Sequence, residues 1–162
     1  MSDIDLTEDV AVVTGGASGI GRKISLTLAE QGADVVVADL QSEPREGGTP
    51  THERIDAEFD GTGRYVECDV TEPSDLEAAV DAAEALGGIT VMVNNAGISR
   101  SQEFLEIDEA QYDRMMNINA KGVFFGAQAA ADRMIEADRE GSIVNLASIS
   151  GVTGRATGVH YC

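Results

Sequence analysis

The chain has 162 residues, and its 29 acidic residues against 11 lysines and arginines give a formal net charge of −18. A chain of this length fits one domain with a sizeable core, and its hydrophobic fraction of 43% is ordinary for a globular protein. No apolar run approaches the roughly 20 residues of a membrane span, and the scarce bases leave no basic patch for phosphates, so neither a membrane nor a nucleic acid is expected as a partner.

Five short apolar runs predict β-strands, at residues 10–13, 33–38, 64–68, 89–93 and 142–146. Runs without polar interruption are typical of strands that are buried on both faces. Between them, the spacing of apolar residues predicts helices at 19–31, at about 50–59, from 71 or 74 to 86, and at 108–138. Thr49 is the expected cap of the second helix, and either Thr71 or Ser74 of the third. From Ala147 onward the composition predicts an active-site loop.

Strands that alternate with helices predict parallel βαβ units with right-handed crossovers. We therefore expect an α/β fold built on a doubly wound parallel sheet. A ligand of such a sheet binds beyond the carboxyl ends of the strands, where the strand order reverses.

The first expected strand runs into a glycine-rich turn, Thr14-Gly15-Gly16-Ala17-Ser18-Gly19-Ile20-Gly21. Gly15 would permit the tight turn, Gly19 would let the backbone approach a pyrophosphate, and Gly21 would let the following helix pack closely. The free amides and positive dipole end of that helix would face the phosphates. The position between a strand and a helix favours this interpretation over an ordinary turn. The predicted cofactor-binding residues here are Gly15, Ser18, Gly19, Ile20 and Gly21.

Asp39 stands at the end of the second expected strand. A carboxylate at this place can accept hydrogen bonds from the adenosine ribose hydroxyls, and it repels a 2′-phosphate. No arginine or lysine lies beside Asp39 or at Ser18 to compensate, so NAD is predicted in preference to NADP. The alternative is that Asp39 is a helix cap or a solvated acid in a turn.

Further motifs follow along the chain: Asp69-Val70, Asn94-Asn95-Ala96-Gly97, Asn119-x-x-Gly122, Ser148 and Tyr161. With the turn, and in this order and spacing, they resemble the short-chain dehydrogenase/reductase family. The Asn-Asn-Ala-Gly motif resembles the compact branch, and the chain is similar to 3-oxoacyl-acyl-carrier-protein reductases and sugar or alcohol dehydrogenases. The resemblance implies a Rossmann-like, three-layer α/β/α fold, here with the first five strands in the order 3-2-1-4-5.

The resemblance also implies which residues bind the cofactor outside the glycine turn. Asp69 and Val70 would hold the adenine. Asn95, Ala96 and Gly97 would line the cofactor and support the central sheet. A turn after a strand is the alternative for the asparagine.

The implied catalytic residues are Asn119, Ser148 and Tyr161. Asn119 would sit at a distortion of the long helix and hold a water in a proton relay; an exposed mid-helix asparagine is the alternative. Ser148 would donate a hydrogen bond to the substrate carbonyl, with Ser150 as its nearest rival. Tyr161 would be the general acid/base and would also contact the cofactor.

The implied reaction is hydride transfer between nicotinamide C4 and the carbon of a secondary alcohol or ketone. A tyrosine needs help in this reaction because an ordinary phenol costs on the order of 4 kcal/mol to ionise at pH 7. The family supplies that help with a lysine four residues after the tyrosine, and the chain ends before that position. We therefore expect residues 1–162 to form a single NAD-binding Rossmann domain that is truncated at its C-terminus and weakly active or inactive alone.

Two other interpretations of the incomplete pattern stay open. One is a non-catalytic dinucleotide-binding module, and the other is a poorly folded remnant whose fifth strand is an unpaired edge. The family's homo-oligomers are doubtful for such a chain, because their contacts also involve elements beyond residue 162.

The acidic residues are spread along the whole chain, which indicates a solvated surface. Self-repulsion at this charge density destabilises a compact state unless salt screens it, so a halophilic protein is expected and an acidic mesophilic one is the alternative. The acidic N-terminus lacks the start of a signal peptide, and Cys68 and Cys162 form no disulfide framework, which favours a reducing cytoplasm. His52 and His160 lack neighbouring ligands, so no metal is expected.

Overall fold

Five parallel strands form one sheet in the computed structural model, which describes residues 4–162. The strands are β1 (Val10–Thr14), β2 (Asp34–Asp39), β3 (Gly63–Glu67), β4 (Val91–Asn94) and β5 (Ser142–Asn145). Their order across the sheet is β3-β2-β1-β4-β5, which confirms the predicted doubly wound α/β fold. The order reverses between β1 and β4, so the binding crevice of such a sheet lies where these two strands end.

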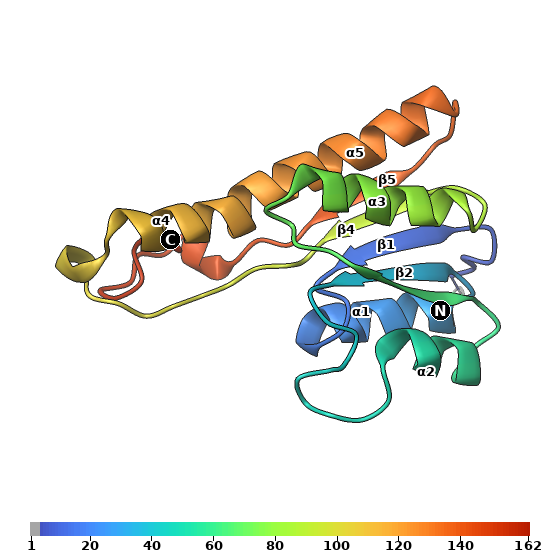
Figure 1. Cartoon of the computed structure of the whole chain (residues 1–162), viewed down its shortest axis with the longest axis horizontal. Coiled ribbons are helices and arrows are strands. Elements are labelled where there is room, and N and C mark those ends of the chain that lie inside the picture. Colours follow the sequence, from blue (N-terminus) through green and yellow to red (C-terminus); the bar gives the residue numbers. More distant parts are fainter. Residues whose placement is uncertain (1–3) are drawn as a thin grey trace.

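Helices cover both faces of the sheet. They are α1 (Gly19–Glu30), α2 (Thr51–Glu58), α3 (Pro73–Glu84), α4 (Glu109–Met116) and α5 (Gly122–Glu136). Figure 1 shows α1 and α2 below the sheet and α3 and α5 above it, which confirms the three predicted layers. Helix α4 lies beyond the carboxyl ends of the strands, where it borders the C-terminal residues Val159 and His160. Within residues 4–162, no helix is long and apolar enough to cross a bilayer.

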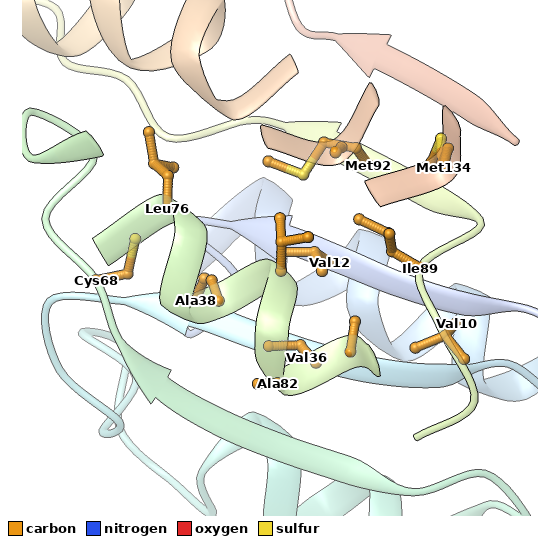
Figure 2. Close-up of a cluster of buried hydrophobic side chains, with 14 residues drawn as sticks. Val10, Val12, Val36, Ala38, Cys68, Leu76, Ala82, Ile89, Met92 and Met134 are labelled. Carbon is orange, nitrogen blue, oxygen red and sulfur yellow. The ribbon is translucent and has the colours of Figure 1, made fainter. Parts of the chain in front are cut away.

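The two central strands, β1 and β2, contribute alternate residues to two separate cores. Val12 and Val36 belong to the core beneath α3 and α5, which Figure 2 shows together with Leu76 of α3. Val13 and Val37 belong to the core that α1 and α2 cover. All four valines are fully buried, which explains why these strands have no polar alternation in the sequence.

Two of the predicted helix caps are wrong by one or two residues. Pro50, not Thr49, precedes α2, because Pro50 has an extended ψ of 146° and thus stands outside the helix. Glu72 precedes α3 in place of Thr71 or Ser74. The hydroxyl of Thr71 is engaged by a carboxylate earlier in the chain, so it does not reach the helix amides.

The long helix predicted at 108–138 is divided in two. A π-helical turn, η2 (Asn117–Lys121), joins α4 to α5. Asp108 caps α4 through a capping box with Gln111, which agrees with the predicted start of the helix at Asp108. The turn η2 contains Asn119, which is where a distortion of the helix was expected.

Strand β5 is an edge of the sheet in the described chain, and all four of its residues are exposed. Ile143 and Val144 expose 38% and 47% of their surface, whereas the valines of β1 are buried. The expected unpaired edge is therefore present. An exposed edge strand offers unpaired backbone groups to another chain, so β5, with its exposed Ile143 and Val144, is a candidate site of self-association.

We expect Val144→Lys to reduce self-association of the chain, because a lysine on an edge strand opposes the approach of a second edge. The measurement is light scattering after gel filtration in molar KCl, where the repulsion of the acidic surface is screened. The control is Ile135→Lys, which adds the same charge at a 78% exposed position in a helix, α5, rather than in a strand. Equal self-association of the two variants would contradict the role of the edge.

Candidate active site

The glycine turn after β1 packs so closely against the start of α1 that there is no space for side chains at Gly15 and Gly21. Gly15 and Gly19 have φ values of +67° and +55°, in the left-handed region that favours glycine. A Cβ atom on Gly21 would collide with the carbonyl oxygen of Gly15 and with the side chain of Asn95. The turn therefore brings the start of α1 directly to the end of β1, as the sequence interpretation of these glycines requires.

Hydrogen bonds from Thr14 and Asn95 tie this turn to the end of β4. The Thr14 hydroxyl accepts from the amides of Asn95 and Ala96, at 3.0 and 3.1 Å, and donates to the carbonyl of Val93 at 3.4 Å. The Asn95 side-chain amide donates to the carbonyls of Thr14 at 2.9 Å and Gly15 at 3.4 Å. Thr14 was not predicted as a site residue, although its place at the head of the turn motif was a signal for it.

Asp39 faces the turn from the end of β2, and only 8% of its surface is exposed. One carboxylate oxygen accepts from the amide of Ala17 at 3.0 Å, and the other accepts from the amide of Leu40 at 2.8 Å. A carboxylate has about four acceptor sites, so these two bonds leave acceptor positions of Asp39 free. Asp39 thus also fixes the turn, a contact that the sequence did not reveal.

The fold brings one distant arginine, Arg45, to the turn, and Arg22 follows the turn directly in α1. Along the chain no arginine or lysine lies beside Ser18, but the fold brings Arg45 there: its backbone amide donates to the Ser18 hydroxyl at 2.9 Å. Arg22 of α1 also donates to the hydroxyl of Thr51 and to the carbonyl of Thr49, both at 2.8 Å. The loop between β2 and α2 therefore lies on the turn.

Asp69 and Val70 lie at the end of β3, at the edge of the same crevice. The Asp69 carboxylate accepts from the amide and the hydroxyl of Thr71, at 2.9 and 2.8 Å, and so shapes its own turn. A Cβ atom on Gly122, the glycine of the Asn-x-x-Gly motif, would stand 2.9 Å from the carbonyl oxygen of Val70. The motif glycine therefore lets α5 start against this end of β3.

The side chain of Asn119 holds the main chain that follows Gly97. Its oxygen accepts from the amide of Ile98 and its nitrogen donates to the Ile98 carbonyl, both at 2.8 Å. The Asn119 oxygen also lies 3.4 Å from where a Cβ atom on Gly97 would stand. Asn119 is half-buried at the π-helical turn, not an exposed mid-helix residue, and its contacts make it a positioning residue for the segment after β4.

Burial separates Ser148 from its rival Ser150. Ser148 is half-buried, and its oxygen accepts from the amide of Ser150 at 3.2 Å, which leaves its hydroxyl proton to donate. Ser150 exposes only 1% of its surface, so a substrate would not reach it. Tyr161 is half-buried in the loop after η3 (Ile149–Gly151). No hydrogen bond joins its hydroxyl to Ser148 or Asn119, all three of which lie in the described chain.

We expect Gly21→Ala to destabilise the chain by about 1–3 kcal/mol, because its methyl group must push apart the turn and the side chain of Asn95. Urea unfolding followed by circular dichroism measures the loss. The control is Gly151→Ala, where the added methyl group meets nothing within 4 Å and should change the stability little. Equal stability of the two variants would contradict the close approach.

Comparison with known proteins gives the family. The family model described as short chain dehydrogenase matches residues 9–162. L-2,3-butanediol dehydrogenase of Corynebacterium glutamicum is 44% identical over 146 residues, which cover 90% of this chain and 56% of that protein. L-rhamnose 1-dehydrogenase (NAD(P)(+)) of Azotobacter vinelandii is 40% identical over 158 residues, which cover 96% of this chain and 61% of that protein.

A solved structure agrees with these sequence relatives. The crystal structure of a short-chain type dehydrogenase/reductase from Mycobacterium marinum superimposes with a TM-score of 0.89 at 36% identity, and covers 99% of this chain and 64% of that one. The chain thus spans between 56% and 64% of the length of these three proteins.

Proposed function

The chain belongs to the short-chain dehydrogenase family, and from this premise we propose that it binds NAD(H) for hydride transfer between the nicotinamide and a secondary alcohol or ketone. One observation carries the proposal: the glycine turn presents the first amides of α1 beside the buried carboxylate of Asp39. The names of the relatives support an alcohol or sugar substrate, since they denote dehydrogenases of butanediol, carveol, rhamnose and hydroxysteroids.

The turn has the shape and the chemistry that a pyrophosphate needs. A side chain on Gly15 or Gly21 would collide with neighbouring atoms of the chain, whereas a Cβ atom on Gly19 would meet nothing within 4 Å. The first amides of a helix lack partners within the helix, and the positive end of its dipole favours an anion. Asp39 would accept hydrogen bonds from the ribose hydroxyls and repel a 2′-phosphate, so we propose NAD in preference to NADP.

Three residues of this chain would serve the reaction when the nicotinamide supplies or accepts the hydride. Ser148 would donate a hydrogen bond to the substrate oxygen, which becomes more negative in the transition state. Tyr161 would pass a proton to or from that oxygen. Asn119 would keep the main chain of Ile98 in place beside the cofactor, and its predicted role in a water relay stays a prediction.

A second candidate is a dinucleotide-binding module without catalysis. It is favoured by the absence of any hydrogen bond, in the described chain, between the Tyr161 hydroxyl and the side chains of Ser148 and Asn119. Turnover of any alcohol offered together with NAD would exclude this second candidate.

We expect the chain to bind NADH more tightly than NADPH, and Asp39→Asn to weaken NADH binding about tenfold, because a hydrogen bond to a charged acceptor is lost. The same change removes the repulsion of a 2′-phosphate, so the preference for NADH over NADPH should fall. Isothermal titration calorimetry in molar KCl measures the four affinities.

The control for this charge removal is Asp34→Asn, on the same strand. Asp34 starts β2, at the opposite end from Asp39, and its carboxylate also accepts a backbone hydrogen bond, from Thr62 at 2.6 Å. Asp34→Asn should leave both cofactor affinities unchanged. A folded chain that binds neither NADH nor NADPH would overturn the proposed function.

We also propose a high-salt setting for the protein, on the strength of its net charge of −18. The free energy of unfolding should rise by about 1 kcal/mol or more between roughly 0.1 and 2 M KCl, because salt screens the repulsion among the acidic side chains. Urea unfolding at each salt concentration measures the change. Sucrose at equal osmolality, which screens no charge, should stabilise less; an equal effect of sucrose would contradict the electrostatic cause.

A further inference from the structure

The loop between β2 and α2, residues 40–50, places a carboxylate on the phosphate-binding turn. A carboxylate oxygen of Glu46 accepts a hydrogen bond from the backbone amide of Gly19 at 3.1 Å. The neighbouring amide of Arg45 donates to the hydroxyl of Ser18 at 2.9 Å. Both contacts join parts of the chain that are far apart in the sequence, and neither Glu46 nor Arg45 was predicted as a site residue.

The amide of Gly19 is one of those that the proposed cofactor would need. Gly19 is the first residue of α1, so its amide has no partner within the helix and lies at the positive end of the helix dipole. Such amides bind phosphate oxygens in glycine-rich turns. The carboxylate of Glu46 is an anion with oxygen acceptors, and it occupies this amide as a phosphate group would.

The surroundings of Glu46 keep it charged. The pKa of the Glu46 carboxyl lies below its ordinary value, because its own backbone amide and that of Gly19 donate hydrogen bonds to it. Burial opposes this shift of the pKa, and the positive charges of Arg22 and Arg45 lower the pKa by smaller amounts. At neutral pH the side chain is therefore an anion held on the turn by donors that would otherwise be available to a phosphate.

We propose that Glu46 is a built-in anionic ligand of the phosphate-binding turn, which the pyrophosphate of the dinucleotide must displace. The inference rests on the proposed function, since it concerns the same site. It assigns to residues 40–50 a role in setting the affinity for the cofactor. Only molecules in which Glu46 has left the turn could bind the pyrophosphate. The apparent affinity for the cofactor is therefore reduced in proportion to the fraction of molecules in that state.

The contacts of this loop hold its C-terminal end, next to Thr51, and leave the segment around Glu46 able to move off the turn. Gly47 and Gly48 have φ values of +80° and +94°, and a Cβ atom on either would meet nothing within 4 Å. After them the chain is anchored, because the Thr51 hydroxyl donates to the carbonyl of Ala17 at 3.1 Å and Arg22 donates to the Thr51 hydroxyl. Displacement of the Glu46 carboxylate breaks none of these anchoring contacts, so α2 can keep its place.

The test compares NADH binding by the 162-residue chain and by two variants, Glu46→Ala and Glu43→Ala, in isothermal titration calorimetry. Glu43 lies in the same loop, and its backbone carbonyl rather than its carboxylate accepts a hydrogen bond, from Gln41, so its truncation removes a carboxylate that does not touch the turn. Glu46→Ala should bind NADH about threefold to tenfold more tightly than the unchanged chain, since a competing charged hydrogen bond is gone. Glu43→Ala should bind as the unchanged chain does.

Three results would overturn the inference, and they separate it from the proposed function. If the unchanged chain binds NADH and Glu46→Ala binds equally well, the carboxylate does not compete. If Glu46→Ala binds more weakly, Glu46 is a ligand of the cofactor rather than its competitor. In both cases the proposed function stands. If all three proteins are folded and none binds NADH, the proposed function fails and the inference fails with it.

A second measurement follows the contact itself. In the free chain, Glu46→Ala should shift the amide signal of Gly19 in a nitrogen–proton correlation spectrum, and Glu43→Ala should not. With saturating NADH, the Gly19 signals of the unchanged chain and of Glu46→Ala should coincide, because Glu46 has then left the turn. Signals that still differ in the saturated state would show that Glu46 remains in place, which would overturn the inference.

Discussion

The close approach of α1 to the end of β1 is the constraint on which the candidate site depends. Gly21 stands where a methyl group would strike the carbonyl of Gly15, so the helix can begin only directly at the strand end. Thr14 and Asn95 then fasten this turn to β4, and Asp39 fastens it to β2. Three strand ends are thus fixed relative to one helix terminus, which is the preorganisation that a phosphate site requires.

The fold could be predicted from the sequence because its central strands are buried on both faces. Uninterrupted apolar runs such as those around Val12 and Val36 are typical of such strands when they alternate with helical patterns along the chain. The glycine turn was equally visible, since its spacing is a local property. The caps at Thr49 and Thr71 were wrong because Pro50 and Glu72 precede the two helices and neither side chain makes a capping hydrogen bond, so the caps that the sequence signals describe are not formed.

The parts of the site that the sequence did not reveal all depend on contacts between distant segments. No periodicity or motif links Glu46 to Gly19, or Asp39 to the amide of Ala17. Burial is similarly hidden from the sequence. Ser148 and Ser150 are the same residue type two positions apart, and only the structure shows that Ser150 is enclosed. Motifs therefore locate such a site, while the loop that lies over it must be found in three dimensions.

The sharing of β1 and β2 between two cores has a consequence for how the molecule loses its structure. Successive residues such as Val12 and Val13 pack on opposite faces of the same strand. If one helical layer detached, it would expose one face of β1 and β2, and the strands on which the other layer packs would lose half of their burial. The backbone amides of these strands should therefore be protected from solvent exchange to the level of global unfolding. Local opening should be confined to the exposed edge strand and to the loops beyond the strand ends, so the two layers should melt together as one cooperative unit.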